Sequence, residues 1–299
     1  MLTTENTDNQ IAPSAHASST ASARRGRRSP SRLLAVAVLG LSTLGAACQP
    51  GPMEPGGNTG GNNSGFECES WGEDEAPQAL YQVDGDGLRL IEGKAQKWHV
   101  ETWARFAELI PANARTDLAC YEAHPASLGG AWVAPEDDRL DNWRMAIGRD
   151  RDLAELDHTL IHEFAHLWTL DDGVLDTRTG PRGCSTYHPG EGCPRPGSVL
   201  RSFVETFWSD ADLAAVQREN NSNDPYAGED GAYDRYRRAP GRYVSDYAAT
   251  NPAEDLAETF SHFVLESRPT GNSVADRKVR LLWDSPAAVN LRTQIRASL

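Results

Sequence analysis

The sequence has too few basic residues to suit a nucleic-acid-binding protein. It contains 29 Lys and Arg against 43 Asp and Glu, which gives a formal net charge of −14. The imbalance is larger beyond residue 47, where 24 basic residues face 41 acidic ones, a net charge of −17. Nucleic-acid phosphates require a basic surface. We therefore expect no nucleic-acid partner and a soluble, acidic domain.

The apolar stretch near the N-terminus is shorter than the roughly 20 residues of a comfortable membrane span. It covers residues 33–47, and the basic region before it has no acidic residue after Asp8. This order is typical of an export signal. The following "LGAAC", which ends at Cys48, resembles the lipobox of bacterial lipoproteins, in which the cysteine receives lipid and becomes the mature N-terminus. The resemblance implies a lipoprotein-type signal over residues 1–47 and a lipid anchor on Cys48 in a membrane of the bacterial cell envelope. Ordinary signal cleavage and secretion is the alternative.

Apolar side chains are almost absent from the next segment, residues 48–65. Its sequence "QPGPMEPGGNTGGNNSG" after the cysteine is rich in Gly, Pro and Asn. Such a composition cannot bury a core, so a flexible tether is predicted. Residues 66–299 remain, which is enough for one domain with a sizeable core.

No C-x-x-C spacing occurs among the 5 cysteines, which disfavours a cysteine-based metal site. Four cysteines follow Cys48, and in an exported chain they suggest two disulfides with three possible pairings. The turn-rich "STYHPGEG" between Cys184 and Cys193 could be closed locally. We therefore favour the pairs Cys184–Cys193 and Cys68–Cys120.

Hydrophobic periodicity predicts strands first and helices later, an α+β arrangement. The expected strands are 88–91, 118–121, 131–134 and 143–147. The expected helices are 94–109, 152–170, one that starts at 198 and runs past 208, 251–266 and 276–299. The strand "WRMAI" over 143–147 alternates apolar and polar residues. We interpret it as an edge strand beside a cleft, to which an extended peptide could add.

One otherwise apolar helix carries two histidines and a glutamate. It contains "HTLIHEFAHLWTL", from His158 to Leu170. His162 and His166 are four residues apart and so share a helix face, where they can take two corners of a tetrahedral zinc site. Glu163 lies beside them and can accept a proton from water at the metal. Buried polar groups need partners, which favours a metal over a chance motif on a solvated stripe.

A catalytic zinc needs a third protein ligand, and several residues could supply it. Asp172 takes the last position of an H-E-x-x-H-x-x-G-x-x-D pattern. Thr169 stands where that pattern has the glycine that lets the chain turn back. Three histidines are further candidates: His158, His188 and His262.

A downstream segment offers a better third ligand. "YAATNPAEDLAETF", Tyr247 to Phe260, places Glu254 and Glu258 four apart on one face of an apolar helix. A carboxylate on such a helix needs a partner, which zinc would supply. The alternative is two solvated acids near a helix N-terminus, where the dipole favours them.

H-E-F-x-H followed by Y-x-x-x-N-x-x-E-x-x-A-E-x-F resembles the catalytic domain of anthrax lethal factor and its zinc-peptidase relatives. The resemblance implies a zincin-like fold, with a small N-terminal mixed sheet with helices, an active-site helix and a mainly helical C-terminal part. It also implies one Zn²⁺ per chain. The implied ligands are His162, His166 and Glu254. Only the two motif segments are covered, and residues 173–246 have no counterpart, so the toxin's substrate is not carried over.

The same resemblance assigns roles to three further residues. Glu163 would be the catalytic base and Tyr247 a phenol that assists catalysis. Glu258 would not bind the metal itself but would orient a histidine that does.

The sequence therefore predicts an exported zinc-dependent endopeptidase that hydrolyses peptide bonds in a peptide or protein substrate with water activated by Glu163. Two other classes stay open. A surface-anchored binding module with a structural zinc would need a fourth ligand, for which His188 is the candidate. A zinc amidase acting on cell-wall peptides would use the same residues.

Overall fold

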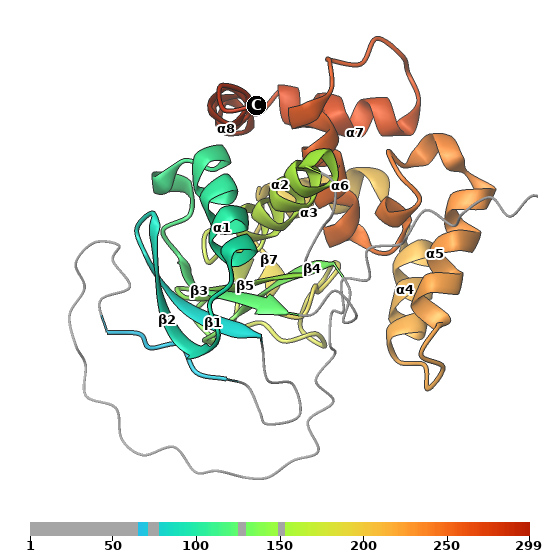
Figure 1. Cartoon of the computed structure of the whole chain (residues 1–299). Helices are drawn as coiled ribbons and strands as arrows, with labels where there is room; N and C mark the ends of the chain where they lie inside the picture. The colour runs from blue at the N-terminus through green and yellow to red at the C-terminus, as the bar shows by residue number, and fades with distance from the viewer. Residues whose placement is uncertain (1–64, 71–77, 125–129, 149–152) are drawn as a thin grey trace, which may run out of the picture. The chain divides into compact units, whose positions relative to one another are not determined.

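A five-stranded mixed sheet and eight α-helices make up the part of the chain that the computed structural model describes, residues 65–70, 78–124, 130–148 and 153–299 (Figure 1). The sheet strands are β1 (Ala79–Asp84), β2 (Gly87–Gly93), β3 (Leu118–His124), β4 (Ala131–Pro135) and β5 (Trp143–Gly148). The helices are α1 (Lys97–Leu109), α2 (Leu153–Thr169), α3 (Val199–Phe207), α4 (Asp210–Asn220), α5 (Ala227–Arg238), α6 (Pro252–Leu265), α7 (Val274–Trp283) and α8 (Pro286–Arg296). The predicted α+β class is confirmed. The predicted export signal, Cys48 and all but the last residue of the predicted tether lie outside the described residues.

The sheet has the order β2-β1-β3-β5-β4, so β4 lies at one edge and β5 in the interior. Only β3 and β5 run parallel; the other neighbours are antiparallel. The prediction that residues 143–147 form an edge strand is therefore wrong. The polar residue in that strand, Arg144, is 1% exposed and binds Glu122 and Glu136 through its guanidinium, at 2.9 and 2.5 Å. Ion pairs, rather than solvent, satisfy the polar face of β5.

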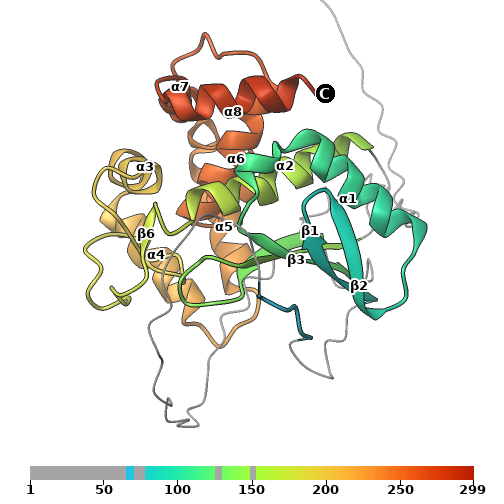
Figure 2. The ribbon, with the colours of Figure 1, turned by 90° about the vertical axis from the view of Figure 1, so that its left-hand side faces the viewer.

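Apolar side chains pack on both faces of the sheet around β1 and β3, while β2 is largely exposed. Figures 1 and 2 show α1 and α2 on the same side of the sheet. Tyr121 and Met145 from the strands and Phe164 from α2 belong to one buried cluster. A smaller cluster includes Leu80 and Ala119. It also contains the disulfide between Cys68 and Cys120, which ties the N-terminal described segment to β3.

Helix α6, which carries Glu254 and Glu258, is almost completely buried. Twelve of its fourteen residues are buried, and it packs against α2, α3, α7 and α8. The side chain of Asn251 caps its first turn, because Oδ1 accepts hydrogen bonds from the backbone N–H groups of Ala253 and Glu254 at 2.9 and 3.1 Å. Pro252 follows at a position where its missing N–H costs nothing. The cap fixes the place of Glu254 at the helix start.

A buried ion pair joins α6 to α7. The side chains of Asp255 and Lys278 are both 0% exposed and bind each other. Trp208 donates to the same carboxylate from its indole N–H at 2.8 Å, and the ammonium of Lys278 also donates to the carbonyl of Arg242 at 2.7 Å. Removing one member of such a pair leaves an uncompensated buried charge.

Lys278→Met should therefore lower the free energy of unfolding by about 3–5 kcal/mol. The double variant Lys278→Met/Asp255→Leu should recover much of that loss, because neither charge then remains buried. Arg277→Met, at an exposed position on the same helix, should change stability by no more than about 0.5 kcal/mol. Urea denaturation followed by circular dichroism measures all three. A double variant no more stable than Lys278→Met would contradict this account of the pair.

Three sets of elements differ from the sequence expectations. The helix expected to start at residue 198 and run past residue 208 ends at Phe207. The single helix expected over 276–299 is two helices, because Ser285 caps α8 and Pro286 occupies its first position. Strand β1 and helices α4 and α5 were not predicted, since their apolar residues follow no clear period. No helix among the described residues is long and apolar enough to cross a membrane.

Candidate metal centre

The two histidines of the H-E-x-x-H motif lie on one buried face of α2. His162 is 3% exposed and His166 is 4% exposed. Their imidazole centroids are 4.8 Å apart, one helical turn along the axis. Apolar neighbours on the other faces, such as Leu160 and Phe164, are fully buried. Packing of this helix on most sides holds both imidazoles in place.

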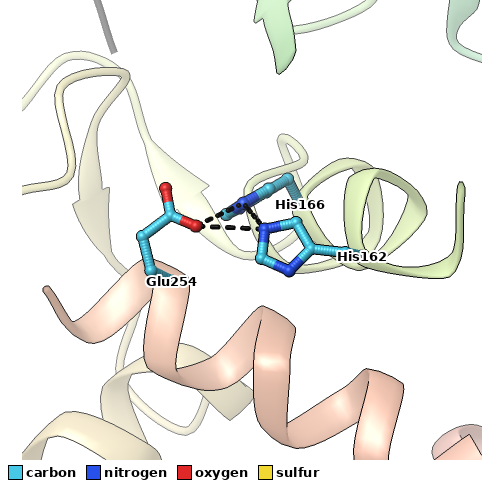
Figure 3. Close-up of side chains that lie close together, drawn as sticks. All are labelled: His162, His166 and Glu254. Carbon is cyan, nitrogen blue, oxygen red and sulfur yellow. Dashed lines mark hydrogen bonds and ion pairs between the residues drawn. The ribbon is translucent and has the colours of Figure 1, made fainter. Parts of the chain in front are cut away.

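Three side-chain atoms from α2 and α6 converge (Figure 3). Nε2 of His162 lies 3.0 Å from Oε2 of Glu254, and Nε2 of His166 lies 3.2 Å from the same oxygen. The two Nε2 atoms are 3.1 Å apart. In the described part of the chain, His162, His166 and Glu254 form the one group of three or more such side chains that could hold a metal ion.

The spacing of these three atoms fits a metal ion. Zinc–ligand bonds of about 2.0–2.1 Å in a tetrahedron place neighbouring ligand atoms about 3.3 Å apart. The observed separations of 3.0–3.2 Å are close to this value. Two nitrogens and one oxygen are a ligand set that zinc accepts in sites with one open position. Burial alone would raise the pKa of Glu254, but His166 and His162 hold it well below its usual range, so this carboxylate carries the negative charge that a metal ligand needs.

Glu258 lies on the other side of the His162 ring. Its Oε1 is 2.8 Å from Nδ1 of His162, and its Oε2 accepts a hydrogen bond from the Ser245 hydroxyl at 2.6 Å. An ionised carboxylate only accepts hydrogen bonds, so Nδ1 donates to Glu258, and Nε2 is the ring atom that would bind a metal ion in place of its contact with Glu254. The pKa of Glu258 is lowered because its bond to His162 outweighs the effect of burial. Glu258 thus lies where it can orient the His162 ring.

Glu163 is buried beside the two histidines and is 1% exposed. Its Oε2 has no hydrogen-bond partner among the described residues. Burial raises the pKa of this carboxyl to about 7, although His162 and His166 act to lower it. A group with a pKa near neutrality can both take up and release a proton at physiological pH.

Tyr247 borders the same group from the short 3₁₀ turn η4 (Tyr247–Ala249). Its ring centroid is 5.8 Å from that of His162. Burial raises the pKa of the phenol well above 10, and the neighbouring carboxylates of Glu254, Glu163 and Glu258 raise it further. The phenol therefore stays protonated and is available as a hydrogen-bond donor.

The other candidate ligands lie elsewhere. Asp172 is exposed beyond the end of α2. His188 makes a hydrogen bond to the carbonyl of Thr179 at 3.2 Å, and Nε2 of His158 is 3.7 Å from Glu258. None of them, nor His262, belongs to the converging group.

Two residues near the site were not anticipated from the sequence, and both lie in the loop closed by the Cys184–Cys193 disulfide. The hydroxyl of Tyr187 donates to Oδ1 of Asn251 at 3.1 Å. The charges of His166 and Glu254 both act on the carboxyl of Glu191. A loop closed by this disulfide was expected from the sequence, but nothing in the sequence indicated which element the loop would approach.

Both disulfides match the expected pairing, with S–S distances of 2.00 Å. Disulfides persist in oxidising compartments, so they indicate an exported protein. Comparison of the chain with protein-family models, with curated proteins and with solved structures gave no match.

Proposed function

We propose that the chain is a zinc-dependent endopeptidase, a zincin of the type that its two motifs resemble, that of the anthrax lethal factor catalytic domain. The observation that carries the proposal is the convergence of His162, His166 and Glu254 from two helices, with Glu163 buried beside them. These three ligands leave a position open, which a catalytic site needs and a structural zinc site does not. The structural-zinc alternative would require a fourth ligand, and among the described residues His188 is not part of the group.

In the proposed reaction, each of the nearby side chains has a defined role. A bound Zn²⁺ would polarise the scissile carbonyl and make water a better nucleophile. Glu163 accepts the proton of the attacking water on its carboxylate and later donates it to the leaving nitrogen. Tyr247 donates a hydrogen bond to the oxygen on which negative charge develops. Glu258 keeps the proton of His162 on Nδ1, which fixes the tautomer.

We further propose that an extended substrate lies along β4. This strand is one of the two edges of the sheet, with β5 on one side and no strand on the other among the described residues. It also packs close to α2, which carries the motif. A free strand edge offers backbone hydrogen bonds to an added peptide, so β4 replaces residues 143–147 in this role.

Metal analysis with a cleavage screen tests the proposal. The full chain, purified with its disulfides intact, should contain one equivalent of zinc and cleave members of a proteome-derived peptide library. A chelator should abolish cleavage and added zinc should restore it. Cleavage confined to peptidoglycan fragments would identify the zinc amidase instead. One bound zinc without any hydrolysis would favour the binding module.

We also propose a lipid anchor on Cys48, which would hold the domain at the cell envelope. Cys48→Ser should move the protein from the membrane fraction to the soluble fraction of the envelope, with zinc content unchanged. Mass spectrometry of the mature N-terminus shows directly whether Cys48 carries lipid. A mature chain that begins at Cys48 without lipid, or at another residue, would rule out the anchor.

A further inference from the structure

The turn η4, which carries Tyr247, is held at its start by two neighbouring side chains. The backbone N–H of Tyr247 donates to Oδ1 of Asp246 at 3.0 Å. The backbone N–H of Ala248 donates to the Ser245 hydroxyl, also at 3.0 Å, and that hydroxyl donates to Glu258 of the metal centre. A single 3₁₀ turn has few and poorly aligned hydrogen bonds of its own, so contacts from outside decide where its tyrosine lies.

A buried arginine from α5 holds the other end of the turn. Nε of Arg235 donates to the carbonyl oxygen of Ala249 at 2.7 Å, and Nη2 donates to that of Thr250 at 2.8 Å. Carbonyl groups at the end of a helical turn lack partners within it. A guanidinium suits them, because it is positive and its donors form a rigid fork. Arg235 therefore fixes the backbone two and three residues after Tyr247.

This arginine is unusual for its helix, which is mostly exposed. Only Ala232 and Arg235 are buried among the twelve residues of α5, and Arg235 is 3% exposed. An unpaired buried guanidinium would be costly. Glu219 of α4, which lies beside α5 (Figure 1), offsets this cost, since both of its carboxylate oxygens accept from Nη1 at 2.6 and 2.7 Å. The two helices thus present one charge-compensated guanidinium to the turn.

A glycine in α5 leaves room for the ion pair. A Cβ added at Gly231 would overlap the carboxylate of Glu219. Glycine weakens a helix relative to alanine, but here the missing side chain lets Glu219 reach Arg235. Gly228 lies three residues earlier on the same helix, and a Cβ added there would meet nothing within 4 Å. The two glycines therefore differ in their effect on the ion pair.

We propose that Arg235, held by Glu219, is a positioning residue that places the Tyr247 hydroxyl for its hydrogen bond to the oxygen on which negative charge develops. This inference rests on the proposed peptidase function and extends it to α4 and α5, which lie in the part of the chain without a counterpart in the resemblance. The ring of Tyr247 lies 5.8 Å from that of His162, so a shift of the turn moves the phenol relative to the metal position. A misplacement of about 1 Å can cost about 100-fold in rate.

Arg235→Gln should lower kcat by about 10- to 100-fold and leave KM within about twofold of the wild type, because the phenol acts mainly in the transition state. Zinc content should stay at one equivalent, since the Asn251 side chain caps the start of α6 next to Glu254. Both constants are measured with the zinc-loaded full chain on one peptide from the cleavage screen. Loss of zinc together with activity would show that the guanidinium holds the metal ligand rather than the phenol, and would overturn the assignment.

Gly231→Ala and Gly228→Ala form a matched pair. Each replaces glycine by alanine in α5, a change that by itself favours a helix. Only Gly231→Ala displaces the carboxylate of Glu219 from Arg235. It should therefore lower kcat in the same direction as Arg235→Gln, whereas Gly228→Ala should keep the wild-type kcat and KM. Wild-type kcat in Gly231→Ala would remove Glu219 from the assignment.

A double-mutant cycle separates a role through Tyr247 from a general loss of structure. Tyr247→Phe removes the hydroxyl that the arginine is proposed to place. Adding Arg235→Gln to Tyr247→Phe should then lower kcat by no more than about twofold further, whereas the effects of two independent residues would multiply. Multiplied effects would overturn the inference and leave the peptidase proposal standing.

Hydrogen exchange tests the same inference without catalysis. The backbone amides of residues 245–251 should exchange faster in Arg235→Gln than in the wild type, while those of α2 keep their protection. If the wild type hydrolyses no peptide, the peptidase proposal fails, and the exchange measurement alone decides whether the arginine holds the turn. Unchanged exchange in residues 245–251 would overturn the inference in either case.

Discussion

Glu163→Gln should lower peptide hydrolysis by about 100- to 10,000-fold, the range that a positioned general base contributes. The amide keeps the size of the side chain but cannot accept a proton from water. Glu163 is buried next to His162 and His166, and its pKa of about 7 suits proton transfer in both directions. Its carboxylate is not one of the three converging ligand atoms, so zinc content should stay at one equivalent.

Glu155→Gln is the matched control for this prediction. Glu155 lies on the same helix, in its first turn, and is exposed. The same chemical change there should leave kcat/KM within about twofold of the wild type, since exposed substitutions away from special features have small effects. Turnover is measured on one peptide from the cleavage screen, alongside zinc content and circular dichroism. Wild-type turnover in Glu163→Gln would show that another group is the base.

The part of the site that is local in sequence was predictable, because helix geometry relates spacing to position. His162 and His166 share a face of α2 as their four-residue separation requires. Glu254 lies 92 residues from His162. Because Glu254 and Glu258 share one helix face, the spacing alone did not show which of them approaches the metal position. The resemblance favoured Glu254. In the structure the two carboxylates lie on opposite sides of the His162 ring, at Nε2 and at Nδ1.

The features that the sequence did not predict depend on distant partners. Arg144 made its strand look half-exposed, but its buried guanidinium pairs with Glu122 of β3 and with Glu136, the residue after β4. Glu191 sits between two glycines, which is typical of an exposed turn. The loop that carries Glu191 is held by the Cys184–Cys193 disulfide and by the hydrogen bond of Tyr187 to the α6 cap. Amino-acid composition and hydrophobic periodicity do not show where in the fold these two contacts lie.

Glu254→Ala should weaken zinc binding by more than the roughly 10–100-fold that loss of an outer hydrogen-bond partner costs. His162 and His166 come from one helix and fix two ligand positions, so a third must come from another element. Glu254 supplies it from α6, with Oε2 at 3.0 and 3.2 Å from the two Nε2 atoms. Glu254→Gln should also lose affinity, because the amide keeps the shape but lacks the negative charge. Competition with a chromophoric chelator measures the affinities, and circular dichroism shows whether the variants are folded.

Asp172→Ala and Glu258→Ala complete the series, so that the zinc affinities of the variants can be ranked. Asp172 is exposed past the end of α2, where Thr169 bonds back to the carbonyl of Ala165 at 2.7 Å instead of letting the chain turn toward the site. Its removal should leave zinc affinity nearly unchanged. Glu258 orients His162 without reaching the converging atoms, so its removal should cost about 10–100-fold. The expected order of affinity is therefore wild type and Asp172→Ala, then Glu258→Ala, then Glu254→Ala. Wild-type affinity in Glu254→Ala would exclude this ligand set and return Asp172 and His188 to consideration, because the two histidines would then need a third ligand from elsewhere.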